Sequence, residues 1–240
     1  MEALIFIMII LIASVLQTST GFGFSILATP FLLLIFEPAE AIQINLILSL
    51  VISAFLIKAI KDDIDYGILK KFITGSIIGL PVGIITFMLI EVSSLKMAIG
   101  IVVLILTILL ILRFRIRRGD KRDLAVGGLS GSLTSSIGMP GPPLLLYFSG
   151  TDTEKATLRG TTLAFYLFIY LASLIIQVIF VGTNQTVWIS SLWGLPLVLI
   201  GLFVGQRLFD KINQHVFRIM VYIILLITGC YLMLDSLGVL

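Results

Sequence analysis

Charged side chains are scarce in this chain. Only 12% of its 240 residues are Asp, Glu, Lys or Arg, against about 25% in a typical soluble domain. Hydrophobic residues make up 59%, and the mean hydropathy is +1.18. So few charges cannot cover the surface of a water-soluble domain, and the sequence predicts a polytopic helical membrane protein. The apolar runs cover residues 3–36, 41–57, 72–90, 95–112, 124–149, 160–182, 187–206 and 219–234.

Cysteine and histidine are almost absent as well. With one cysteine, Cys230, and one histidine, His215, the chain can form neither an internal disulfide nor a histidine–cysteine metal site. There is no Walker motif, and the 13 acidic residues fall at the ends of apolar runs or between them. ATP hydrolysis and an intramembrane proton relay are therefore not predicted. The short connecting segments leave no room for a soluble catalytic domain, so we expect no enzyme, catalytic residue, metal or cofactor.

What the chain does contain is a pair of interrupted apolar segments. Residues 18–25 read Thr-Ser-Thr-Gly-Phe-Gly-Phe-Ser and are followed by Pro30, and residues 134–143 read Thr-Ser-Ser-Ile-Gly-Met-Pro-Gly-Pro-Pro. Unwound backbone in hydrocarbon leaves amides and carbonyls unpaired, which costs several kcal/mol per group unless protein or a water-filled cavity satisfies them. Matching interruptions in two halves of a membrane protein indicate the substrate site of a transporter.

The spacing of other landmarks supports two related halves. The sequence Ser76-Ile-Ile-Gly-Leu-Pro81 recurs as Ser191-Leu-Trp-Gly-Leu-Pro196, 115 positions later, and Gly21 and Gly138 lie 117 positions apart. We interpret residues 1–118 as a first membrane repeat and residues 119–240 as a second one. The basic segment 113–122 joins them.

Segment lengths favour a re-entrant hairpin at the start of each half. Residues 124–149 number only 26, whereas two full crossings need about 40 residues. Glycines and prolines interrupt this segment too often for one clean helix. Residues 3–36 are read in the same way, with the interruption near the middle. Two full crossings would place the loops on the same sides, so that alternative stays open.

Basic residues give the orientation. With hairpins that return to their own side, 15 of the 16 basic residues share one side of the membrane and only Lys96 lies opposite, whereas a single crossing by the second segment would give a split of 10 to 6. The positive-inside rule makes the crowded side cytoplasmic. The 15 residues are Lys58, Lys61, Lys70, Lys71, Arg113, Arg115, Arg117, Arg118, Lys121, Arg122, Lys155, Arg159, Arg207, Lys211 and Arg218.

The expected fold is therefore all-α, with two inverted-topology repeats. Each repeat is a broken re-entrant helical hairpin followed by three transmembrane helices. Because three net crossings is an odd number, the halves are inverted relative to each other, as in many secondary transporters. Both termini are expected outside the cell membrane, and the linker 113–122 in the cytoplasm.

The two interrupted motifs, each opening a four-segment half, resemble the TauE/SafE permeases, the sulfite exporter family. The matching residues are Gly21-Phe-Gly-Phe-Ser25 with Pro30, and Gly138-Met-Pro-Gly-Pro-Pro143, and the resemblance covers nearly the whole chain. It implies transport of small sulfur-containing anions, such as sulfite or sulfonates. Substrates vary within the family, so the resemblance does not fix which anion is carried.

The chemistry of the interruptions also favours an anion. A short helix is expected to restart near Phe24 and near Pro142, and a helix N-terminus presents free N–H groups and about half a positive charge. In an inverted repeat the two N-termini approach the midplane from opposite sides, with neighbouring hydroxyls as further donors. The predicted substrate-binding residues are Thr18, Ser19, Thr20, Gly21, Gly23, Phe24, Ser25, Asn45, Thr134, Ser135, Ser136, Gly138 and Gly141.

Alternatives stay open at several positions. Gly79, Gly194 and the pair Gly127-Gly128 fit close helix packing or kinks better than a binding role. Asn45 suits substrate binding and a bridge between helices equally well. Arg159 fits an orienting role at the cytoplasmic surface better than anion guidance. For the whole protein the alternative function is a passive small-anion channel.

The expected partners are the small anionic substrate and membrane lipid, and nucleic acid has no support, because the net charge of +3 is explained by cytoplasmic loops that face anionic lipid. A homo-oligomer is compatible with the sequence.

Overall fold

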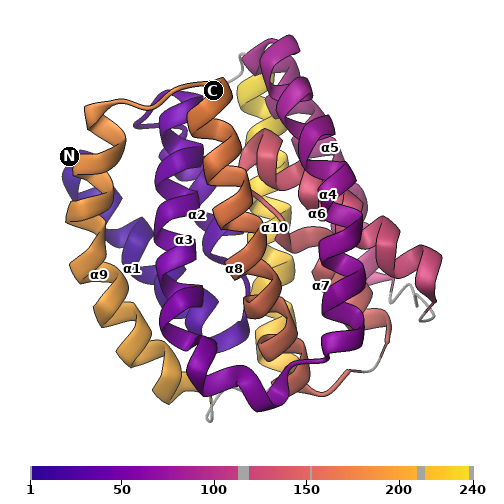
Figure 1. Cartoon of the computed structure of the whole chain (residues 1–240). Coiled ribbons are helices and arrows are strands. Elements are labelled where there is room, and N and C mark those ends of the chain that lie inside the picture. The colour runs from indigo at the N-terminus through magenta and orange to yellow at the C-terminus, as the bar shows by residue number, and fades with distance from the viewer. Residues whose placement is uncertain (1, 113–118, 152, 210–213, 238–240) are drawn as a thin grey trace.

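The computed structural model describes residues 2–112, 119–151, 153–209 and 214–237. Within those residues the chain forms ten α-helices, one 3-10 turn and no strand (Figure 1). The elements are α1 (Glu2–Thr20), α2 (Phe24–Leu32), α3 (Pro38–Ile60), η1 (Lys61–Asp63), α4 (Tyr66–Leu89), α5 (Val92–Ile111), α6 (Asp120–Ile137), α7 (Gly141–Gly150), α8 (Lys155–Phe180), α9 (Gln185–Phe209) and α10 (Gln214–Ser236).

Five of the described helices are long and apolar enough to cross a membrane, namely α1, α3, α4, α8 and α9. Their outward side chains are large and apolar, as shown by Ile78 on α4, which is 74% exposed, and Trp193 on α9, which is 73% exposed. Polar side chains such as Asn45 and Gln177 are instead fully buried. This distribution is expected of a membrane protein, because polar side chains are costly in lipid and therefore face the interior of the helix bundle. The prediction of an all-helical, multi-pass membrane protein is confirmed.

The helical structure is interrupted at the two places that the sequence predicts. α1 ends at Thr20 and α2 begins at Phe24, while α6 ends at Ile137 and α7 begins at Gly141. α2 has 9 residues and α7 has 10, which gives lengths of about 13 and 15 Å, half of a hydrocarbon core about 30 Å thick. α1, however, contains an 18-residue candidate span, so it is long enough to cross alone. Part-way entry of the first segment therefore stays a prediction.

The longer helices pack in pairs. α4 lies against α6, α1 against α9, α5 against α10, and α3 against α8. In Figure 1, α9 and α1 lie to the left, α3 and α8 in the middle, and α4 to α7 to the right. The interrupted helices thus flank a central α3–α8 pair.

Small residues allow the closest of these contacts. A Cβ added to Gly79 on α4 would overlap with the carbonyl oxygen of Gly128 on α6, and one added to Gly127 would overlap with the carbonyl oxygen of Phe72. On the other side, Gly201 of α9 faces Ser14 of α1 just as closely. Backbones that approach this far are typical of membrane helix interfaces. The packing interpretation of Gly79, Gly127 and Gly128 is confirmed.

An ion-pair cluster joins the beginnings of α4 and α6. Lys71 Nζ lies 2.7 Å from Asp120 Oδ1 and 3.0 Å from Asp123 Oδ2. The hydrogen bond from Lys71 holds the pKa of the Asp120 carboxyl below its usual value. Asp123 is 1% exposed, so Lys71 neutralises a buried carboxylate. The cluster therefore holds the beginning of α4 and the beginning of α6 at the same end of the molecule.

Candidate functional site

The first interruption is a three-residue turn between α1 and α2. Gly21 and Gly23 have positive φ angles, 86° and 111°, which residues with a Cβ atom rarely adopt. The Thr20 hydroxyl accepts a hydrogen bond from the Phe22 N–H, 3.1 Å away, and donates to the Leu16 carbonyl at 2.6 Å. The turn is buried, with Phe22 1% exposed and Phe24 fully buried.

The second interruption, between α6 and α7, is built differently. Gly138 ends α6 in the left-handed conformation with a φ of 71°, and its N–H donates to the Thr134 carbonyl at 2.7 Å. Pro140 then precedes α7, whose first three residues are Gly141, Pro142 and Pro143. Glycine supplies the turn and proline supplies a φ suited to a first helical turn.

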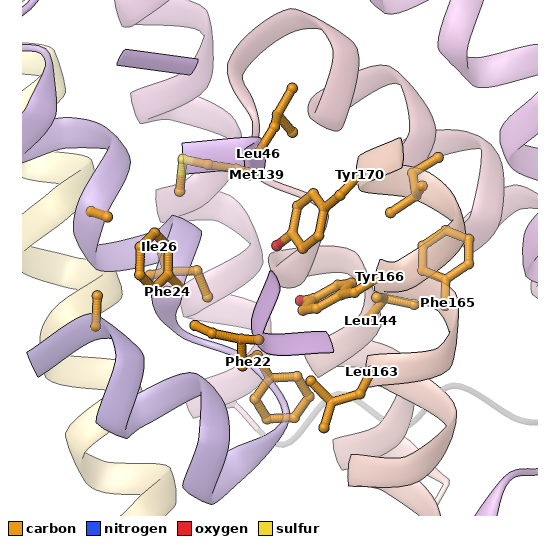
Figure 2. Packing of buried hydrophobic residues seen from close by; sticks show 14 of the residues in the cluster. Phe22, Phe24, Ile26, Leu46, Met139, Leu144, Leu163, Phe165, Tyr166 and Tyr170 are labelled. Carbon is orange, nitrogen blue, oxygen red and sulfur yellow. The ribbon is translucent and has the colours of Figure 1, made fainter. Parts of the chain in front are cut away.

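The two restarting helices approach each other. A Cβ added to Gly141, the first residue of α7, would lie 3.1 Å from Ile26 Cδ1 in the first turn of α2. It would also lie 3.0 Å from the Tyr166 hydroxyl on α8. Figure 2 shows Phe22, Phe24 and Ile26 on one side of this region and the rings of Tyr166 and Tyr170 on the other.

Buried side chains satisfy the carbonyl ends of the helices that stop. Arg159 Nε on α8 donates to the Thr18 carbonyl at 2.9 Å, and Asn45 Nδ2 on α3 donates to the Gly138 carbonyl at 2.8 Å. Gln177 Nε2 on α8 donates to the Ser135 carbonyl at 2.7 Å. The last carbonyls of a helix have no partner within the helix. The central helices α3 and α8 therefore supply that partner at both interruptions.

The amide ends of the helices that restart have no such cap. Neither α2, preceded by Gly23, nor α7, preceded by Pro140, has a side-chain hydrogen bond at its N-cap. Among the described residues, none accepts a hydrogen bond from the N–H of Phe24, Ser25 or Gly141. These N–H groups carry the positive end of the helix dipole. The N–H groups of Phe24, Ser25 and Gly141 are therefore donors available to a ligand, next to the amide oxygens of Asn45 and Gln177, which are buried acceptors without a hydrogen-bond partner among the described residues.

Most of the predicted hydroxyl donors are occupied within the fold. Ser19 donates to the Val15 carbonyl at 2.8 Å, Thr134 to the Ser130 carbonyl at 2.5 Å, and Ser136 to the Ser132 carbonyl at 2.7 Å. Ser135 donates across to the Leu80 carbonyl of α4 at 2.8 Å, so it ties α6 to α4. Bonds of this kind are the usual resting state of helical Ser and Thr. Thr18 Oγ1 is buried without a hydrogen-bond partner among the described residues.

The predicted hydroxyl of Ser25 differs from these, because it pairs with a side chain of α8. Its Oγ lies 2.5 Å from the Tyr170 hydroxyl oxygen, and both residues are buried. Two hydroxyls have two protons, and the bond between them uses one. The pair therefore keeps one proton that can be donated to a ligand.

The residues that sequence reasoning missed lie on α8. A stripe of buried polar side chains follows one face of this helix over its whole length, with steps of three or four residues that match the helical repeat. That periodicity was the available signal. Arg159, which the sequence already singled out, belongs to it: it is 8% exposed and packs over the Phe209 ring at 4.2 Å. The stripe consists of Arg159, Thr162, Tyr166, Tyr170, Ser173 and Gln177.

Metal ligands do not gather anywhere in the part of the chain that the structure describes. No group of three or more His, Cys, Asp or Glu side chains is found there. Asn45, Ser25 and the backbone N–H groups are neutral and suit a hydrogen-bonded ligand.

A family model matches residues 6–232, and its description is sulfite exporter TauE/SafE. The chain belongs to this family. Members of the sulfite exporter family are membrane transporters and not enzymes. The match covers both interruptions, the whole of α2 to α9 and most of α1 and α10, in agreement with the resemblance seen in the motifs. A comparison with curated proteins gave no match, and neither did a comparison with solved structures.

Proposed function

We propose that this protein is a secondary transporter of the cell membrane that carries small sulfur-containing or organic oxyanions, such as sulfite or sulfonates. The anion is held near the midplane between the N-termini of α2 and α7. One observation carries this proposal: at both interruptions the protein caps the carbonyl ends and leaves the amide ends uncapped.

The difference between the two kinds of helix end selects the sign of the ligand. The carbonyls of Thr18, Gly138 and Ser135 already accept hydrogen bonds from Arg159, Asn45 and Gln177, so they are less available to a cation. An anion needs donors, and the N–H groups of Phe24, Ser25 and Gly141 are such donors at the positive ends of α2 and α7. These donors favour an oxyanion as the ligand.

The order and packing of the helices support an inverted repeat. Each half consists of a long helix, a short helix and three further helices, α1 to α5 and α6 to α10. The contact of α4 with α6 has its counterpart in the contact of α9 with α1, and the pairs α3–α8 and α5–α10 each join equivalent helices. This is the pairing expected of two halves related by a pseudo-two-fold axis in the membrane plane.

Transport by purified protein in liposomes tests the proposal. We expect vesicles loaded with sulfite to take up labelled sulfite, and the exchange to be competed by methanesulfonate but not by sodium ions at equal concentration. Counterflow distinguishes a carrier from a passive channel, because only a carrier accelerates uptake when substrate is present on the far side. Steady single-channel currents without counterflow would favour the channel, and uptake of none of these anions would refute the proposed function.

A further inference from the structure

The amino end of α7 is poorly supplied with backbone donors. Of the four residues from Pro140 to Pro143, only Gly141 carries an N–H, because the other three are prolines. The amino end of α2 is richer, since Phe24 and Ser25 both have an N–H and Ser25 adds a hydroxyl. An anion between the two helices would therefore be held unevenly unless a side chain supplied donors on the side of α7.

Tyr166 lies where such a side chain is needed. It is 1% exposed, and its hydroxyl oxygen lies 3.0 Å from the position of a Cβ added to Gly141. No described residue forms a hydrogen bond with this hydroxyl. A phenol hydroxyl can donate one hydrogen bond and accept others, so this one is available to a ligand. Figure 2 shows the oxygens of Tyr166 and Tyr170 turned toward the region between α2 and α7.

The neighbouring tyrosine serves the other helix. The Tyr166 and Tyr170 rings are one helical turn apart with centroids 4.9 Å from each other, and the Tyr170 hydroxyl reaches Ser25 on α2. Each tyrosine of α8 thus points to the amino end of one restarting helix. A phenol donates to an oxyanion through a strong, charge-assisted hydrogen bond.

We propose that the Tyr166 hydroxyl is a ligand of the transported anion and supplies, at the amino end of α7, the donor that the prolines remove. This inference rests on the proposed function. It makes Tyr166 a determinant of affinity for oxyanions, while Tyr170 acts together with Ser25 at the amino end of α2.

The test compares three substitutions that each remove one hydroxyl and keep the ring. Tyr166→Phe and Tyr170→Phe change the site, and Tyr147→Phe is the control. Tyr147 is equally buried on α7, but its ring packs on Phe72 and Phe148. Each purified variant is heated in detergent with and without sulfite or methanesulfonate, and its KM for sulfite is measured in liposomes.

We expect Tyr166→Phe to weaken sulfite binding about ten-fold or more, as for the loss of a hydrogen bond to a charged partner. Its unfolding temperature without an anion should stay the same or rise, because an unpaired buried hydroxyl is gone. Tyr170→Phe should lower that temperature, since it breaks the bond to Ser25, and Tyr147→Phe should leave the KM within about two-fold of the wild type.

Unchanged sulfite binding by Tyr166→Phe, next to wild-type protein that binds and transports sulfite, would overturn this inference and leave the proposed function intact. An equal loss of binding in Tyr147→Phe would also overturn it, because the effect would then come from any buried tyrosine. Wild-type protein that binds neither sulfite nor methanesulfonate would overturn the proposed function and the role of Tyr166 with it.

Discussion

At the scale of single residues, Gly21 and Gly182 share a backbone conformation but not their surroundings. Their φ angles are 86° and 87°. A Cβ on Gly21 would lie 2.9 Å from the Cα of Arg159, whereas nothing lies within 4 Å of one on Gly182. The first position is therefore constrained by conformation and by packing, and the second by conformation alone.

This pair gives a test of how tightly the first interruption is held against α8. We expect Gly182→Ala to lower the free energy of unfolding by about 1–2 kcal/mol, the cost of left-handed backbone for an L residue. Gly21→Ala should cost about 1–3 kcal/mol more, because the Arg159 backbone cannot move aside without disturbing α8. Denaturation of both variants in the same detergent measures the difference. Equal losses would show that the contact between Gly21 and Arg159 is looser than described.

The sequence predicted the backbone conformation of the interruptions better than the hydrogen-bond partners of their side chains. Glycine and proline act locally, so the positive φ of Gly21 and Gly138 and the restart of a helix at Phe24 followed from residue type. The partner of a hydroxyl depends on the fold. Ser135 was expected to face the substrate but donates to the Leu80 carbonyl of a helix more than 50 residues away. The hydrogen bond from Arg159 to the Thr18 carbonyl joins residues 141 positions apart, so nothing local predicted it.

At the scale of helices, the contact between α4 and α6 depends on glycine. Gly79→Ala would place a methyl group on the Gly128 carbonyl oxygen, so the two helices would have to separate. We expect a loss of at least about 1–3 kcal/mol in the free energy of unfolding and less folded protein in the membrane.

Gly67→Ala, in the exposed first turn of the same helix, is the matched control. Its added Cβ would have only the Asp65 carboxylate nearby, at 3.3 Å, and alanine favours the helix by up to about 1 kcal/mol. Fluorescence-detected size exclusion of both variants compares their folded yields. A Gly79→Ala yield equal to that of Gly67→Ala would contradict a close α4–α6 interface.

Helix boundaries and helix pairing differ in how far the sequence predicts them. Apolar runs separated by charged or glycine-rich segments predicted the number and order of the helices, and repeated small residues such as Gly79 and Gly194 indicated interfaces. Nothing local says that α4 pairs with α6 while α1 pairs with α9. That pairing depends on the whole bundle. The length of α1 also shows that an apolar run and an interruption do not fix how deep each arm of a hairpin enters.

At the scale of the whole molecule, the orientation in the membrane is the main untested prediction. The distribution of basic residues predicts both termini outside and the linker 113–122 in the cytoplasm. The ion pairs of Lys71 with Asp120 and Asp123 join the beginning of α4 to the start of α6, so these two helix ends lie on the same side.

Single cysteines test this orientation. Cys230 is exposed and must first be replaced, as in Cys230→Ala. In that background we expect an impermeant maleimide to label Glu2→Cys on intact cells and Gly119→Cys only after permeabilisation, since a side chain at Gly119 meets nothing within 4 Å. Labelling of position 119 from outside would reverse the predicted topology.

The neutrality of the proposed donors also has an electrical consequence. The donors on α2, α7 and α8 carry no charge, and Arg159, which donates to the Thr18 carbonyl, keeps its charge whether the carrier is empty or loaded. Loading would then change the charge of the carrier by the charge of its anion, so each transport cycle would move that charge through the membrane field. A voltage of 100 mV, negative inside, contributes about 2.3 kcal/mol per charge in the outward direction. Such a carrier would expel a monovalent oxyanion from the cell without coupling to any other ion.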